Sequence, residues 1–247
     1  MQSSTVKKYA IYALGEIALV VLGILIALQI NTWNEQRKDV KKTAEYMDRL
    51  KSELRSDSVM LGNHISDAHR KAAICKNIQQ VLNGESKVGD SREFILNIQQ
   101  VGRLTLPAVD NNTFEDLQSS GNLGLIQDHA LSDDIRNYYN EVPYWWFDQY
   151  SNQLVDLYLP LVVEAIPMRI HEEILALETG IVESSDLFID FGDLEVQDQD
   201  LVNTLDFIRS HSEYPAILKR IHRSHLVHVK LLTRMQIHCH RLIAMLK

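Results

Sequence analysis

A single carboxylate, Glu16, lies inside the most apolar stretch of the chain, residues 9–30. A charge near the bilayer centre costs about 2.5–3.5 kcal/mol on insertion scales, so it usually faces a partner helix, a cavity or the headgroups. Gly23 and Ala27 fall on the same helical face as Glu16, and small side chains let a second helix approach closely. Glu16, Gly23 and Ala27 therefore predict a transmembrane assembly surface; a ring of Glu16 side chains lining a pore is the sharper alternative.

The C-terminal part of the chain contains a cluster of five histidines, namely His222, His225, His228, His238 and His240. Imidazole binds zinc and other transition metals. A spacing of three residues fans side chains around a helix, so only His225 and His228 could share an ion, with His64 or an acid from another helix. The alternative, which we favour, is that His225 and His228 are partly buried polar spacers. We therefore expect no cofactor.

A run of aromatic residues includes Tyr144, Trp145 and Trp146, which could form a partner or lipid surface or pack in a core. Adjacent tryptophans cannot both face one core, so one of the two is expected to be exposed. Nucleophile-elbow, P-loop, dinucleotide-binding and Cys–His signatures are absent from the sequence. The sequence thus favours a protein that is not an enzyme.

The position of Glu16 depends on the structure of the apolar stretch around it, and the length of this stretch indicates a transmembrane helix. Twenty-two helical residues reach roughly 33 Å, enough to cross a bilayer core of about 30 Å. A cleaved signal peptide would need small residues at a cleavage site after the run, and none are present. A buried core helix is the other alternative, but Ile17–Leu28 is apolar all round and lacks the polar face of a soluble surface helix, so a single-span anchor is favoured. Six Lys or Arg residues follow the stretch within about twenty residues and two precede it, which predicts a cytoplasmic C-terminal domain.

The composition limits the partners. The 247 residues have a net charge of −8, and an acidic domain lacks the field that attracts phosphates, so nucleic acid is an unlikely partner. The two cysteines form no disulfide framework or CxxC motif, which fits a reducing compartment. The expected partners are the lipid bilayer, further copies of the chain in a homo-oligomer, and a protein partner.

Apolar residues recur every seven positions after the apolar stretch: Met47, Leu54, Leu61, Ala68, Cys75 and Leu82. The same phase extends backwards into the stretch, which predicts one helix from the membrane to about Val81, stopped at Asn83-Gly84. The companion positions are imperfect, because Leu50 and Ile78 fit whereas Asp57, His64 and Lys71 do not. A packed bundle helix is therefore preferred to a two-stranded coiled coil.

The rest of the chain also has a helical pattern. Helix starts are expected at Asp90, Asn112 and Asp128, with a stop at Gly121, an interruption at Pro143 and a kink at Pro160. Residues 179–197 are expected to form a loop, with a short strand in LFIDF as an option, and residues 198–210 a helix. Ser212 is expected to cap a last helix, long enough to lie antiparallel to the first, with the stripe Leu218, Ile221, His225, His228, Leu232, Met235, Cys239, Leu242 and Leu246.

The predicted fold is all-α: a single N-terminal transmembrane helix that continues into the long helix of an antiparallel bundle. The domain boundaries are a tail at 1–8, the transmembrane helix at 9–33, a long juxtamembrane helix at 34–84 and a helical bundle domain at 85–247.

Two segments resemble a bacterial family that is defined only as a domain of unknown function. They are GEIALVVLGILIALQINTWNEQRK, residues 15–38, and NTFEDLQSSGNLGLIQDHALSDDIRNYY, residues 112–139. The resemblance implies a membrane-anchored, mainly helical protein, located in the bacterial inner membrane, and it supplies no reaction. Our first functional hypothesis is a non-enzymatic single-pass membrane protein that self-assembles or binds a protein. An oligomeric pore or membrane effector gated by the domain is the second, and a metal-dependent enzyme is the weakest.

Overall fold

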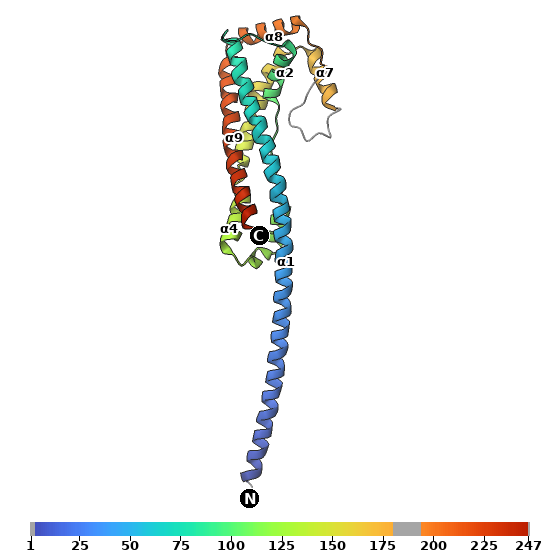
Figure 1. Ribbon diagram of the computed structural model, residues 1–247, viewed down its shortest axis with the longest axis vertical. Coiled ribbons are helices and arrows are strands. Elements are labelled where there is room, and N and C mark those ends of the chain that lie inside the picture. The colour runs from blue at the N-terminus through green and yellow to red at the C-terminus, as the bar shows by residue number, and fades with distance from the viewer. Residues whose placement is uncertain (1–2, 180–193, 247) are drawn as a thin grey trace.

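One helix, α1 (Ser3–Leu82), runs through both the apolar stretch and one side of the helical domain (Figure 1). The computed structural model describes residues 3–179 and 194–246, and every regular element in these ranges is helical. The predicted all-α fold is therefore confirmed. The other elements are α2 (Ser91–Gly102), α3 (Asn112–Ser119), η1 (Asn122–Leu125), α4 (His129–Asn140), α5 (Tyr144–Asn152), η2 (Gln153–Tyr158), α6 (Leu159–Ala165), α7 (Met168–Thr179), α8 (Asp198–Ser210) and α9 (Tyr214–Met245).

Residues 14–42 of α1 are exposed throughout. Its most apolar window has a mean hydropathy of 2.1, and no residue of that window is buried. Among the described helices, only α1 is long and apolar enough to cross a membrane. The helix ends where predicted, since Gly84 adopts a φ of +74°, a left-handed conformation that favours glycine.

The last helix, α9, packs antiparallel along the C-terminal half of α1, as the stripes predicted (Figure 1). All nine residues of the α9 stripe are buried. The single glycine within this part of α1 has a packing role, because a Cβ at Gly62 would lie 3.0 Å from Nε2 of Gln236, which donates to the Ser58 carbonyl. The two helices therefore approach closely at this point.

The companion positions of α1 differ from the expectation. Asp57, His64 and Lys71 were judged not to fit a buried face, yet all three are buried together with Leu50 and Ile78. The physical reason for Asp57 and Lys71 is that each lies against a segment that supplies polar partners, as described below. His64 differs, because its buried Nδ1 has no hydrogen-bond partner among the described residues. Burying a polar group is tolerated where hydrogen bonds replace those lost to water.

The shorter helices cover the α1–α9 pair. Asp90 and Asp128 cap α2 and α4 as predicted, each accepting a hydrogen bond from a backbone N–H three residues later. Instead of a simple kink before Pro160, the chain widens into the π-helix η2, where the Leu159 N–H donates to Leu154, five residues back. Proline cannot donate the usual bond, so a wider turn absorbs the strain.

Two local predictions require correction or fall outside the described ranges. Ser212 does not cap the last helix: the N-cap of α9 is Glu213, and its side chain makes no capping bond. Pro215 occupies the first turn of α9, where its missing N–H is not needed. The optional strand LFIDF, residues 187–191, lies outside the described residues. Helix α7 was not predicted from the sequence, and it begins directly after Pro167.

Candidate functional site

The segment that connects α2 to α3, residues 103–111, is extended and lies along α1. Its contacts with α1 run in the opposite chain direction: residues 103 and 105 meet Lys71, residue 110 meets Asp57, and Thr113 meets Glu53. We call this row of contacts the polar seam; it runs on α1 from Lys71 to Tyr46. Over those 25 residues the seam extends roughly 38 Å along α1.

A buried ion pair closes the end of the polar seam that lies far from the apolar stretch. Lys71 Nζ is 2.8 Å from Asp67 Oδ2, and the two side chains are only 1% and 5% exposed. Lys71 also donates to the Arg103 carbonyl at 2.7 Å and to Thr105 Oγ1 at 3.2 Å, and Thr105 in turn donates to Asp67 at 3.0 Å. Burial lowers the pKa of Lys71, and the Asp67 carboxylate opposes that shift. The start of the extended segment is thus fixed by a charge inside the core.

Asp57 occupies the middle of the polar seam. Its carboxylate accepts from the backbone N–H of Asp110 at 3.0 Å and from the Tyr138 hydroxyl at 3.1 Å. Burial raises the pKa of Asp57 to about 6, although both hydrogen bonds act in the opposite direction. One side chain of α1 therefore ties together the connecting segment and α4.

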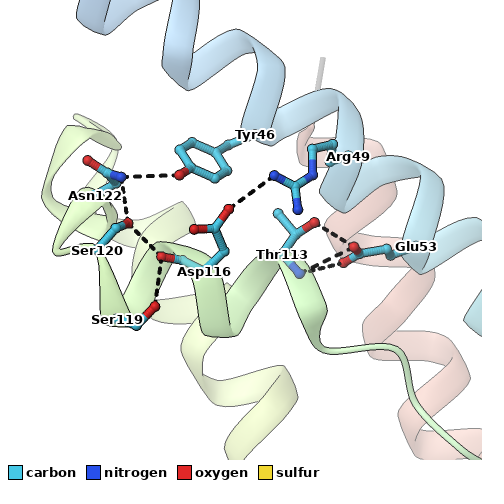
Figure 2. A network of polar contacts seen from close by, with 8 residues as sticks. All are labelled: Tyr46, Arg49, Glu53, Thr113, Asp116, Ser119, Ser120 and Asn122. Atoms are coloured by element: carbon cyan, nitrogen blue, oxygen red, sulfur yellow. Dashed lines mark hydrogen bonds and ion pairs between the residues drawn. The ribbon is translucent and has the colours of Figure 1, made fainter.

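Figure 2 shows the end of the polar seam nearest the apolar stretch. Glu53 accepts from both the backbone N–H and the hydroxyl of Thr113, at the start of α3. One turn earlier on α1, Arg49 forms an ion pair with Asp116 at 3.1 Å. One turn earlier again, the Tyr46 hydroxyl accepts from Asn122 at 3.1 Å, in the turn after α3. Three successive turns of α1 are thereby held by one short segment.

That short segment is the second region on which the family resemblance rests. Its Ser-Gly-Asn turn needs glycine, because Gly121 has a φ of +71°. The turn brings Asn122 back toward α1, and Asn122 also contacts Ser120 (Figure 2). One signal in the sequence could have indicated part of the polar seam: Asp57, His64 and Lys71 are polar residues at the seven-residue spacing of a buried stripe.

The histidines predicted as possible metal ligands lie in the core beside aromatic rings. His225 and His228 are 0% and 1% exposed, so they are fully rather than partly buried. The Tyr150 hydroxyl is 2.8 Å from His225 Nδ1, and Trp146 Nε1 donates to His228 Nδ1 at 3.3 Å. Burial lowers the pKa of His228 to about 4 and that of His225 well below its ordinary value. In the described part of the chain no three His, Cys, Asp or Glu side chains are placed to hold one metal ion.

The aromatic surface predicted from Tyr144, Trp145 and Trp146 is divided by the fold. Tyr144 and Trp145 are exposed, whereas Trp146 is 6% exposed and faces the core. Trp146 nevertheless lines, together with Trp145, a groove between α5, η2 and α9. A partner or lipid surface at these residues stays a prediction. The expectation that one of the two tryptophans is exposed is confirmed, and Trp145 is that residue.

Glu16, Gly23 and Ala27 lie on the exposed half of α1, far from the polar seam. A Cβ built on Gly23 would meet no atom of another described segment within 4 Å. The structure brings these three residues together on one helix and joins them to no other predicted site.

Fold and site together define an all-α protein whose long first helix carries an apolar part and is fastened to the domain along a polar seam. A family model, the family of unknown function DUF6090, matches residues 16–191, so the chain belongs to that family. The matched region contains every contact of the polar seam, while α9 lies beyond it. No curated protein and no solved structure matches the chain.

Proposed function

We propose that this protein is a non-enzymatic, single-pass protein of the bacterial inner membrane whose helical domain acts by self-assembly or by binding another protein. The observation that supports this most directly is the continuity of α1. Its apolar part is unburied over its whole most apolar window, and the same helix then supplies the central helix of the domain. An apolar helix of this length is satisfied by a bilayer.

In this proposal the apolar part of α1 is the membrane anchor, and the polar seam transmits its movement to the helical domain. Between Trp33 and Tyr46, the first buried residue of α1, the helix is unaccompanied for about 20 Å. A shift or rotation of the anchor would therefore reach the domain through one rigid helix. The contacts of Tyr46, Arg49 and Glu53 would then carry that movement into α3 and the turn after it.

Cysteine cross-linking in native membranes tests the anchor and its assembly. Gly23→Cys and Ala27→Cys place thiols on the proposed assembly face, and Leu25→Cys places one on the opposite face as the control. The native Cys75 and Cys239 are buried and would not react. We expect cross-linked dimers at positions 23 and 27 and none at 25. Equal yields at all three positions, or membrane extraction by carbonate alone, would refute the proposal.

Glu16 supports a second candidate function, in which the protein forms an oligomeric pore gated by the helical domain. A carboxylate among exposed apolar residues of α1 is costly in lipid and would gain from facing its own copies around water. Ion flux into liposomes that contain the full-length protein tests this candidate. A current that Glu16→Gln leaves unchanged would remove the conducting role and leave the assembly role intact.

The domain is proposed to face the cytoplasm. Asn63→Cys puts a reactive thiol on the exposed side of α1 within the domain. A membrane-impermeant maleimide should label it in inverted vesicles and not in intact spheroplasts. Labelling in spheroplasts would reverse the assigned orientation without affecting the assembly proposal.

A further inference from the structure

Charge is distributed very unevenly between α9 and the chain that precedes it. Helix α9 contains six Lys or Arg residues and no acid, whereas residues 104–213 contain 22 acids and only three Lys or Arg residues. Two of the α9 cations, Arg234 and Arg241, form ion pairs with α4 and the turn after it. The remaining four cations, Lys219, Arg220, Arg223 and Lys230, lie nearer the start of α9. The domain is therefore acidic overall but has a basic edge.

The two signs meet at a groove of about 970 Å³ between α9 and the α5–η2 segment. Asp148 and Asp156 line one wall, and Arg220 and Arg223 line the other. All four side chains are exposed, and none forms an ion pair among the described residues. Opposite charges thus stand in two rows that do not neutralise each other across the groove.

The groove lies between two antiparallel segments, residues 145–157 and residues 220–227. The α5–η2–α6 segment ascends from α4, at the end nearer the apolar part of α1, and α9 descends beside it (Figure 1). The Ser224 hydroxyl bonds to the Gln153 side chain and so fixes the register of the two walls. Asp156 consequently lies near the level of Arg220. Trp145, 66% exposed, stands at the lower end of the groove.

Two copies anchored in one membrane with the same orientation are related by a two-fold axis along the membrane normal. An axis in that direction placed along the groove exchanges its two walls while it keeps every height unchanged. The acidic row of each copy then faces the basic row of the other, with Asp156 opposite the partner's Arg220. Trp145 would meet its own equivalent beside the axis, and exposed aromatic residues are frequent anchors of interfaces.

We propose that this groove is a dimer interface and that its occupant is a second copy of the same chain. The inference rests on the proposed self-assembly, and it places the domain contact at the groove rather than at the membrane helix. Complementary rows of charge set the pairing and its orientation, since like charges would oppose any other register.

Charge reversal in full-length protein in native membranes tests the proposal. The reporter is Asn152→Cys, which lines the groove, with Asn63→Cys on the outer side of α1 as its matched control. Dimers are trapped with a short bis-maleimide. We expect dimers through position 152 and at least tenfold fewer through position 63. The yield through position 152 should fall as salt is added, because exposed charges are screened.

Two double variants of the reporter then reverse one row each. Arg220→Glu with Arg223→Glu makes both rows acidic, and Asp148→Arg with Asp156→Arg makes both rows basic. Each should lower the dimer yield at least tenfold, while helicity and the unfolding midpoint stay close to those of the parent. Co-expression of the two double variants should restore the yield as heterodimers, and all four substitutions in one chain should restore homodimers.

Unchanged yields in both double variants would overturn the inference. So would rescue within one chain without rescue by co-expression, because the rows would then pair across their own groove. A groove that serves a small zwitterionic ligand instead would give no cross-link through position 152 at all. If Gly23→Cys still cross-links in that case, only the groove interface fails; if neither position cross-links, the proposed self-assembly fails as well.

Discussion

Removal of the buried lysine from the polar seam should be among the most destabilising single changes in the domain. Lys71→Met keeps the length and the apolar stem of the side chain but deletes the charge that neutralises Asp67. Asp67 is almost fully buried, and its Oδ1 already has no hydrogen-bond partner among the described residues. Breaking a buried pair from one side costs about 3–5 kcal/mol, because an uncompensated charge stays inside. The melting temperature should fall by about 6–20 °C for a chain of this size.

Urea unfolding of the full-length protein in detergent, followed by circular dichroism, measures the loss. The control is Lys76→Met on the same helix, where the lysine is exposed and forms no ion pair among the described residues, and it should change stability by less than about 0.5 kcal/mol. The double variant Lys71→Met with Asp67→Asn should recover part of the loss, since the amide is neutral and can still bond to Thr105. If Lys71→Met lowers the free energy of unfolding no more than Lys76→Met does, the polar seam does not contain a stabilising buried ion pair.

Three further predictions follow from local chemistry. The pKa of His228 is about 4 in the fold, below the ordinary value of 6.5, so the unfolded chain binds more protons between these pH values. On acidification from pH 7 to 4.5 the wild type should thus lose about 2–3 kcal/mol relative to His228→Gln in urea unfolding, and parallel pH profiles would contradict this. Gly121→Ala should cost about 1 kcal/mol because of its positive φ, whereas Gly124→Ala, a control in open space, should be nearly neutral by thermal unfolding. Thr113→Val removes a hydroxyl that donates to Glu53 and should cost about 1 kcal/mol. Hydrogen exchange in residues 103–112 should then accelerate several-fold with α9 unaffected; uniform acceleration would argue against a local role for the seam.

Local patterns in the sequence were sufficient for most helices. The caps at Asp90 and Asp128 and the stop at Gly84 depend on residues within one turn, so their outcome does not require the rest of the fold. The prediction that Ser212 caps α9 was wrong for a related reason. Several consecutive residues can begin a helix, and propensity alone does not choose among them. The seven-residue stripes predicted that α1 and α9 pack together, because burial of apolar faces needs only a matching length and phase.

The burial of the polar residues of α1 could not be predicted from local patterns in the sequence. Asp57 and Lys71 break the apolar stripe, and apart from Asp67, four residues before Lys71, the partners that satisfy them are distant in the sequence. Their partners, Asp110 and Arg103, lie 53 and 32 residues further along the chain. The same holds for His228, whose partner Trp146 is 82 residues away.

The sequence by itself determined that this chain has an apolar helix long enough for a membrane and an all-α domain, since both depend on the order of side chains along one helix. The tertiary structure decided where the polar side chains go. It placed the Ser-Gly-Asn turn at residues 120–122 on α1 beside Tyr46, and it set the acids of α5 and η2 across a groove from the arginines of α9. Such contacts depend on the register between distant segments, which is fixed only when the whole domain packs at once.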